Sequence, residues 1–420
     1  MTGLSSERRS GATKALILLL AINLSNYIDR YVLAAVEPNI RAAFFAADDP
    51  NAMAMTGMLA PAFLVTYMLA APALGWLADR FSRWWIIGIC AVIWSLATAA
   101  SGLAGTFATL FITRVFVGIG EGGYGPAAPT ILADYFSPEA RARVMAVFCA
   151  AIPVGSALGY VIGGVVSAQF GWRWAFYAVA LPGLILAALC FLQTDPRAPG
   201  GTREQRRRAG KEDYLILLRT RSFLFNCGAQ TAMTFALGGL AFWMPAYLIF
   251  RNQSPSLATP LFGGITVVAG LMSTLAGGFL ADRLQKRFGG SYFMVSGIGM
   301  LLAFPLFIAT IYTPFPMAWV TLFAAIFFVF LNTGPSNAAL ANVAAPRVRA
   351  TAFAVNILVI HLLGDAISPP LLGLVAGRWN MNVAFFVVSL AMLVSGVVWL
   401  AGMKFLKEDT AVVTASSAHP

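Results

Sequence analysis

The chain has 420 residues, of which 59% are hydrophobic and only 11% are charged, and its mean hydropathy is +0.78. Soluble domains are closer to half apolar and a quarter charged, so this composition excludes a soluble globular protein and indicates an integral membrane protein. The apolar residues come in segments of roughly 18 to 28, the length of a helix that crosses a hydrocarbon core of ~30 Å. We therefore expect an all-α membrane protein, because the short alternating segments of a β-barrel do not occur.

Twelve apolar segments are predicted to span the membrane. Their approximate limits are 15–40, 52–78, 84–102, 107–134, 142–168, 175–193, 222–250, 259–281, 291–312, 316–341, 350–377 and 381–406. The start of the first segment resembles a signal peptide, but it runs past Ala34 without a convincing cleavage site. We therefore interpret it as the first transmembrane helix.

The net charge of +11 raises the possibility of a nucleic-acid-binding protein, and the placement of the basic residues argues against it. Four of the 28 Lys and Arg residues lie in predicted outer loops and two lie deep inside predicted spans, which leaves 22 on the inner side if both termini are cytoplasmic. This asymmetry follows the positive-inside rule. It predicts a multi-pass protein of the cell (inner) membrane with both termini in the cytoplasm.

The cysteines and the other potential ligands predict neither a disulfide nor a bound metal. The four cysteines are Cys90, Cys149, Cys190 and Cys227. All four lie inside predicted spans, and they form no CxxC pair. Such residues are typical of small packing side chains. We expect no metal and no cofactor, and we expect a monomer that needs no partner beyond substrate, protons and membrane lipids.

Residues 194–219 form the only long polar stretch between spans, and they contain six arginines together with Pro and Gly. Such a composition indicates a cytoplasmic linker that divides the spans six and six. The predicted domains are an N-terminal half (1–193), the linker (194–219), a C-terminal half (220–408) and a tail (409–420).

An internal repeat supports this division. The sequence "GWLADRFSR" at 75–83 follows span two, and "GFLADRLQK" at 278–286 follows span eight, at an offset of 203 residues. Two parallel six-helix halves are typical of secondary transporters of the major facilitator superfamily. The repeated loop and the span-four sequence "RVFVGIG" resemble motifs of that superfamily. The resemblance implies twelve helices in two pseudo-symmetric halves and transport by alternating access.

The charged residues of the repeated loop are candidates for a conformational latch. Asp79 is positioned to accept hydrogen bonds at a neighbouring helix N-terminus, and Arg80 and Arg83 can pair with Asp134 at the inner end of span four. The family resemblance implies that this cluster holds the two halves together when the cavity faces outward. The corresponding residues of the second half are Asp282 and Arg283. The alternative is that these charges only set the topology.

Asp29, Arg30, Arg114 and Glu121 lie inside predicted spans of the N-terminal half. An ionised group at mid-bilayer costs at least ~2.5–3.5 kcal/mol, so it needs a partner or a water-filled cavity. A rise of about 1.5 Å per residue places Asp29 roughly 22 Å above the inner surface and Arg114 roughly 10 Å below the outer surface, so the two can pair. The four charges sum to zero, and protonation of one carboxylate leaves a net positive site that favours an anion. The alternative is a permanent network that only fixes helix packing.

The C-terminal half carries a different polar set. His361 and Asp365 are four residues apart in span eleven and therefore share a helix face, and Asn332 and Asn337 lie in span ten. The sequence supplies no third ligand that would make the His–Asp pair a metal site. We expect a bend or break just beyond Pro369 and Pro370.

Four longer stretches narrow the resemblance. They are "NYIDRYVLAAVEPNI", "GIGEGGYGPAAPTILADYF", "AIPVGSALGYVIGG" and "HLLGDAISPPLLG". Together they resemble the spinster branch of the superfamily. This resemblance implies that the four intramembrane charges form the polar floor of a central cavity, and that the substrate is a lysophospholipid or a sphingosine phosphate. Parts of the same stretches also resemble the anion:cation symporter branch, which moves small organic acids.

Other classes of function lack their motifs in this chain. A primary pump needs a phosphate-binding GxxxxGK[ST] loop, and a hydrolase of the GxSxG type needs its nucleophile, and neither sequence occurs. A channel is harder to exclude, but the duplicated loop motif suits alternating access better. We therefore predict a secondary transporter, not an enzyme, that couples an amphipathic anion to protons. The charge-free stretches "FALGGLAFWMPAYL" and "FAAIFFVFL" favour a lipid over a small organic anion, which remains the alternative.

Overall fold

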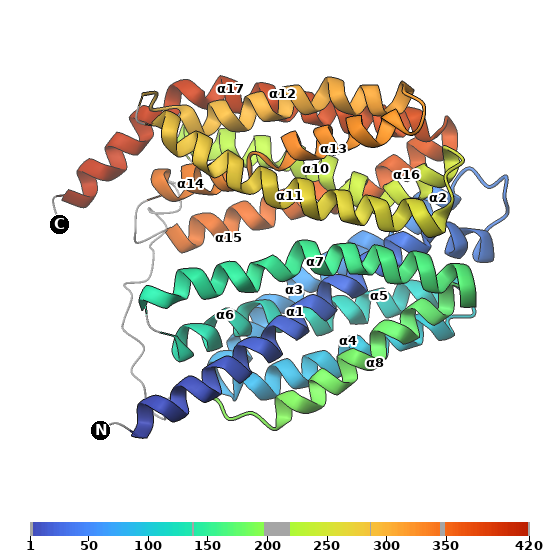
Figure 1. Ribbon diagram of the computed structural model, residues 1–420, viewed down its shortest axis with the longest axis horizontal. Coiled ribbons are helices and arrows are strands. Elements are labelled where there is room, and N and C mark those ends of the chain that lie inside the picture. The colour runs from blue at the N-terminus through green and yellow to red at the C-terminus, as the bar shows by residue number, and fades with distance from the viewer. Residues whose placement is uncertain (1–2, 137, 197–218, 286, 345–348, 419–420) are drawn as a thin grey trace. The chain divides into compact units, whose positions relative to one another are not determined.

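The computed structural model describes residues 3–136, 138–196, 219–285, 287–344 and 349–418, and these ranges are helical and contain no strand (Figure 1). The helices of the first half are α1 (Gly3–Phe44), α2 (Ala52–Gly57), α3 (Leu59–Arg80), α4 (Arg83–Leu103), α5 (Phe107–Glu121), α6 (Tyr124–Tyr135), α7 (Pro138–Phe170) and α8 (Trp172–Phe191). Those of the second half are α10 (Arg221–Phe250), α11 (Pro255–Gln285), α12 (Ser291–Tyr312), α13 (Met317–Phe330), α14 (Thr333–Val343), α15 (Arg349–Ile360), the π-helix η1 (His361–Asp365), α16 (Ser368–Arg378) and α17 (Met381–Ala418). The predicted all-α fold is confirmed.

Eleven of the predicted spans correspond to stretches of helix, within the described ranges, that are long and apolar enough to cross a membrane. The fourth predicted span is present as two consecutive helices, α5 and α6, separated by a turn at Gly122 and Gly123. A Cβ atom on Gly123 would lie 2.4 Å from the Cys90 sulfur of α4. The glycines that interrupt the helix therefore also allow it to pack closely against its neighbour.

Cα packing divides the chain into two compact units, Met1–Gly201 with Phe242–Gly264, and Thr202–Ala241 with Ile265–Pro420. The second half of α10 and the start of α11 thus group with the first unit, although they follow the linker in sequence. Most of the predicted linker, residues 197–218, lies outside the described residues. The predicted domain limits remain predictions.

Close packing of α7 on α1 positions the charged segment of the first unit. Gly155, Gly159 and Gly163 share one face of α7, and Cβ atoms built on them would lie 2.5 to 2.8 Å from atoms of α1. A face without side chains lets a neighbouring helix pack closely. Asn23 of α1 also donates a hydrogen bond to the Phe148 carbonyl of α7 at 2.9 Å, which fixes the register of the two helices.

In the second unit, the end of α17 meets the start of α10. The Asp409 carboxylate accepts hydrogen bonds from the backbone N–H of Ser222 at 2.8 Å and from its hydroxyl at 2.6 Å. This is the capping that the first N–H groups of a helix require. Residues 409–418 of the predicted tail continue α17 as helix, and both contacts tie this extension to the body of the unit.

Candidate functional site

Asp29 and Arg30 are consecutive residues of α1 and point to different neighbours. A helix turns by about 100° per residue, so adjacent side chains cannot share a partner on one face. Asp29 reaches α4 and α5, whereas Arg30 reaches the end of α5 and the aromatic residues of α3. Two separate ion pairs result.

The Asp29–Arg114 pair is enclosed by protein. Nη1 of Arg114 lies 3.6 Å from Oδ1 of Asp29, and each side chain is only 2% exposed. The Thr98 hydroxyl donates a hydrogen bond to the other carboxylate oxygen, while the second Nη of Arg114 contacts the hydroxyls of Thr98 and Ser101 at 3.4 and 3.3 Å. The depth argument correctly predicted that Asp29 and Arg114 can pair.

The Arg30–Glu121 pair is tighter and open on the arginine side. Nε of Arg30 lies 2.8 Å from Oε2 of Glu121, and the Arg30 side chain is 23% exposed, whereas Glu121 is fully buried. The second oxygen of Glu121, Oε1, accepts no hydrogen bond from the described residues. The pair therefore combines a carboxylate that is only half satisfied with a guanidinium whose two Nη groups are still able to donate.

Three aromatic rings surround the exposed guanidinium of Arg30. Its central carbon lies 5.0 Å from the ring centroid of Tyr27, 4.8 Å from that of Phe63 and 5.1 Å from that of Tyr67. Such distances are within the range of cation–π attraction. We call Tyr27, Phe63 and Tyr67 the Arg30 box. Sequence reasoning missed it, although Phe63 and Tyr67 are spaced by one helical turn.

Two glycines of α5 allow the close helix packing that buries Glu121. A Cβ on Gly118 would lie 2.2 Å from the Phe63 carbonyl of α3, and one on Gly120 would lie 2.6 Å from the Trp94 backbone nitrogen of α4. Helix α5 can therefore lie against the backbones of both helices, and its last residue, Glu121, becomes buried between them.

Sequence reasoning also missed a carboxylate near the outer end of α1. Glu37 is fully buried and accepts hydrogen bonds from Thr56 at 2.6 Å and from Arg41 at 3.1 Å. Its second oxygen accepts none from the described residues. The signal was present in the sequence, because Glu37 lies within the predicted first span and Arg41 follows it at i+4.

In the second unit, His361 and Asp365 are paired and half-buried. Nδ1 of His361 lies 2.9 Å from Oδ2 of Asp365, and the two residues begin and end the π-helix η1. The Thr234 hydroxyl of α10 donates to the Ile360 carbonyl at 2.9 Å, which satisfies a backbone acceptor beside the irregular turn. A break was predicted just beyond Pro369 and Pro370, but the irregular turn lies before them. The two prolines lie in the first turn of α16, where a helix tolerates proline.

Asn332 and Asn337 do not join the His361–Asp365 pair through any contact described for them. Asn332 is buried and donates to the Val329 carbonyl, and Asn337 is exposed and donates to the Thr333 carbonyl. A different buried amide pair lies in this unit, in which Asn356 donates to Gln230 at 2.5 Å. The polar residues of the second half thus form separate small groups.

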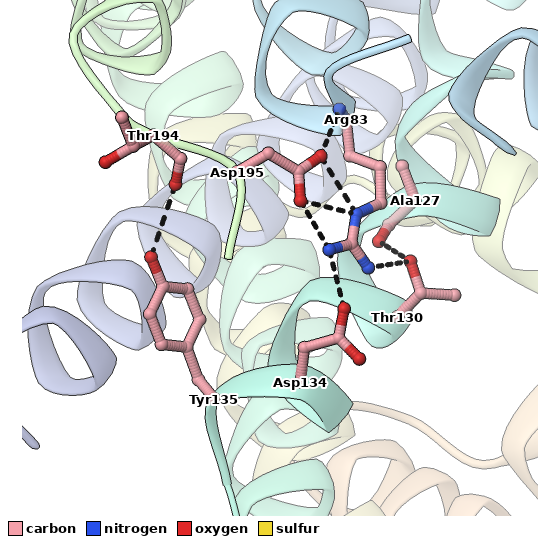
Figure 2. Close-up of polar contacts among 7 residues, drawn as sticks. All are labelled: Arg83, Ala127, Thr130, Asp134, Tyr135, Thr194 and Asp195. Carbon is pink, nitrogen blue, oxygen red and sulfur yellow. Dashed lines mark hydrogen bonds and ion pairs between the residues drawn. The ribbon is translucent and has the colours of Figure 1, made fainter. Parts of the chain in front are cut away.

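The predicted latch residues of the first unit centre on Arg83 (Figure 2). Its guanidinium lies 2.6 Å from the Asp134 carboxylate and 2.5 Å from that of Asp195, and it donates to the Thr130 hydroxyl at 3.1 Å. Asp195 also accepts the backbone N–H of Arg83 at 2.8 Å. Sequence reasoning missed Asp195, which follows α8 at the start of the linker.

The other predicted latch residues behave differently. Arg80 does not reach Asp134, because its guanidinium lies 3.7 Å from the Trp76 ring centroid and donates to the Trp76 carbonyl. The side chain of Asp79 lies outside the described residues. In the second unit, Asp282 accepts a hydrogen bond from the Tyr292 hydroxyl at 3.0 Å, and Arg283 lines a surface hollow.

The part of the chain that the structure describes contains no group of three or more His, Cys, Asp or Glu side chains that could hold a metal ion. All four cysteines are free. Of the predicted intramembrane charges of the first unit, the Asp29–Arg114 pair is enclosed and the Arg30–Glu121 pair is accessible.

The sequence matches the family model of the Major Facilitator Superfamily over residues 19–364. It is 35% identical over 393 residues to protein spinster homolog 3 of Danio rerio, covering 88% of this chain and 78% of the relative. It is 30% identical over 434 residues to the sphingosine-1-phosphate transporter SPNS2 of Xenopus tropicalis, covering 96% of this chain and 83% of the relative.

The fold is similar to the crystal structure of a bacterial homologue of the human lysosomal transporter Spinster, with a TM-score of 0.80 and 24% identity over 96% of this chain and 98% of that one. At this identity the structural match speaks for the fold alone. The sequence matches confirm the resemblance to the spinster branch. The chain belongs to the Major Facilitator Superfamily, within it to the spinster proteins, and is a membrane transporter.

Proposed function

We propose that this transporter moves a single-chain anionic lipid, of the lysophospholipid or sphingosine-phosphate type, in a proton-coupled cycle. The observation that carries the proposal is the accessible guanidinium of Arg30 inside its aromatic box. A phosphate head needs fixed positive charge, and arginine can donate two hydrogen bonds to it at once. Arg114 is fully buried against Asp29 and cannot offer the same contact. We therefore assign headgroup binding to Arg30 and a positioning role to Arg114.

The coupling to protons follows from the charge of the Arg30–Glu121 pair. When Glu121 is ionised, the pair is neutral and one of the Arg30 donors is occupied. A proton on Glu121 removes the negative charge of this partner and weakens its hold on Arg30, which leaves a net positive charge that favours an anion in a site of low polarity. The buried Oε1 of Glu121 has no hydrogen-bond donor among the described residues, so the ionised form is only partly stabilised.

Two further observations support a lipid rather than a small organic anion. The segments 235–248 and 323–331 carry no charge, so these spans of the second half are apolar and offer no ionic partner to a small acid. One relative at 30% identity is named as a sphingosine-1-phosphate transporter. A small organic acid would instead require polar groups in both halves.

The distribution of Lys and Arg supports a topology in which both termini and residues 194–219 are cytoplasmic, in the cell (inner) membrane. We also propose that the protein works as a monomer. A reporter fused at Gly201 should be detected on the cytoplasmic side, and detection on the outer side would overturn the topology.

We propose that the Arg83 cluster, with Asp79 and Arg80, stabilises the closed state of the cytoplasmic side. Arg83 is held by two carboxylates within one unit, so it can act by keeping α4, α6 and the end of α8 together. Arg83→Ala should raise the population of inward-facing molecules in spin-label distance measurements across the inner side. Unchanged distance distributions would leave these charges with a topological role only.

Uptake into proteoliposomes tests the substrate. Purified protein should accumulate a lysophospholipid or sphingosine 1-phosphate, and Arg30→Gln should reduce this uptake at least tenfold, since a hydrogen bond to a charged group contributes about 1.5–3 kcal/mol. Arg173→Gln is the matched control, because Arg173 stacks on Trp172 and donates to the Ala104 carbonyl far from the Arg30 box in sequence. Background lipid uptake beside robust uptake of a small carboxylate would favour the organic-anion alternative.

A further inference from the structure

Two arginines at and just beyond the end of α11 have no carboxylate partner among the described residues. Arg283 and Arg287 line, together with Phe279 and Asp282, a hollow of about 490 Å³ at the surface of the second unit. Neither guanidinium forms an ion pair with any described carboxylate, and Asp282 instead accepts the hydroxyl of Tyr292 at 3.0 Å. The hollow therefore has a net positive charge and free donors.

The arginines of the corresponding loop in the first half have different contacts. At an offset of 203 residues, Arg283 corresponds to Arg80 and Phe279 to Trp76. Arg80 is satisfied by the ring and carbonyl of Trp76, and Arg83 of the same loop is neutralised by two carboxylates. In the first half Arg80 and Arg83 are thus held by neighbouring side chains, whereas Arg283 and Arg287 line a surface hollow without a described carboxylate partner.

An exposed apolar stripe leads along α11 to this hollow. Leu275 is 76% exposed and Phe279 is 69% exposed, which is typical of side chains that face lipid tails and not a protein core. The residues of this stripe are Val268, Leu271, Met272, Leu275 and Phe279. They recur at intervals of three and four along the helix and therefore lie on one face. Arg283 lies one turn further along the same face, and Arg287, which follows the end of the helix, lines the same hollow as Arg283 and Phe279.

We propose that the end of α11 binds the headgroup of an anionic phospholipid from the inner leaflet. The phosphate lies between Arg283 and Arg287, and the acyl chains lie along the apolar stripe. Arginine matches phosphate geometry through paired N–H donors, and each basic residue near an anionic membrane surface adds about a fivefold gain in affinity. This site is separate from the Arg30 box and does not depend on the identity of the transported molecule.

Native mass spectrometry of the full-length protein in mild detergent tests the site. Phosphatidylglycerol should bind in preference to phosphatidylcholine, and the double variant Arg283→Gln/Arg287→Gln should weaken phosphatidylglycerol binding roughly twenty-fivefold, since the two fivefold effects multiply. Arg80→Gln is the matched control, because it removes one charge at the equivalent position of the first half, where the arginine is already satisfied. It should change the affinity less than twofold.

The possible outcomes separate the alternatives. Unchanged phosphatidylglycerol binding by the double variant would overturn the proposal, and so would displacement of the lipid by excess inorganic phosphate, which would indicate a site for a soluble anion. Loss of phosphatidylglycerol binding in Arg30→Gln would place the lipid at the transport site and would also overturn it. If the double variant does not elute as a single folded species, the single Arg287→Gln variant should still show the fivefold effect.

Discussion

Asp29 and Arg30 of α1 each form an ion pair with a residue of α5, and the two pairs have the same charges and different surroundings. Asp29 and Arg114 lie 3.6 Å apart, with 2% of each side chain exposed, and the hydroxyls of Thr98 and Ser101 supply further polar contacts. Arg30 and Glu121 lie 2.8 Å apart, and the arginine is 23% exposed within three aromatic rings. The first pair has the environment of a structural contact, and the second has that of a binding site.

The difference follows from the helix itself. Two adjacent residues are at nearly the same depth but point about 100° apart, so one faces the interior of the helix bundle and the other faces its accessible side. Because a buried pair that loses one partner leaves an uncompensated charge, mutation of the enclosed pair should affect folding, and mutation of the open pair should affect transport. Each prediction below separates these two effects.

The largest effect is expected from Arg114→Gln. The change leaves Asp29 buried without its cation, and breaking a buried pair in this way costs about 3–5 kcal/mol. The variant should show a strongly reduced melting temperature in a thermal-shift assay of purified protein. The double variant Asp29→Asn/Arg114→Gln should regain part of this loss, because no unpaired charge remains. A melting temperature equal to that of wild type in Arg114→Gln would contradict the structural role of the pair.

Glu121→Gln should act on coupling instead of folding. The glutamine fills the same space and can still accept from Arg30, but it cannot take up a proton. Uptake driven by a pH gradient should fall at least tenfold, while exchange of substrate without a gradient should continue and the melting temperature should change little. Asp29→Asn serves as the comparison, since it removes a carboxylate of the enclosed pair. Full gradient-driven uptake by Glu121→Gln would make Glu121 structural and would direct attention to Asp29 or Asp365.

Thr98→Val should have a smaller effect, confined to the enclosed pair. It preserves the shape of the side chain and removes the hydroxyl that donates to Asp29 and accepts from Arg114. Leaving these buried groups less satisfied costs about 1–3 kcal/mol. Thermal stability should fall, and gradient-driven uptake per folded molecule should stay at the wild-type level. A selective loss of coupling would show that the Asp29 environment also belongs to the transport machinery.

The sequence was sufficient to predict the fold and the depth of the charged residues in the membrane, but not the directions in which their side chains point. Length and hydropathy of the apolar segments were sufficient to predict the spans, and a fixed rise per residue brought Asp29 and Arg114 to one level. The same reasoning placed both arginines in one site. Which of them is accessible depends on how closely α5 approaches α3 and α4, and this approach is set by contacts at Gly118 and Gly120 that one sequence does not reveal.

Residues near helix ends were missed for a related reason. Asp195 was interpreted as part of a polar linker, and its contact with Arg83 depends on how the end of α8 returns to the start of α4. Glu37 lies inside the first predicted span and could have been found by counting carboxylates there. The break in span eleven was placed beyond the prolines, whereas helix geometry allows proline in a first turn and moves the irregularity before it.

The smallest effect, and the most specific test of the open pair, is expected from Tyr67→Leu. The Tyr67 ring lies 5.1 Å from the Arg30 guanidinium, and its loss removes a cation–π contact of about 0.5–1 kcal/mol while leaving the arginine in place. With one ring gone, Arg30 is held less firmly, so lipid affinity should fall about two- to fivefold at unchanged gradient dependence. Tyr67→Phe keeps the ring and should bind like wild type, which separates the aromatic contribution from that of the hydroxyl. Equal loss in both variants would assign the effect to the hydroxyl, and no loss in either would mean that the box does not contribute to binding.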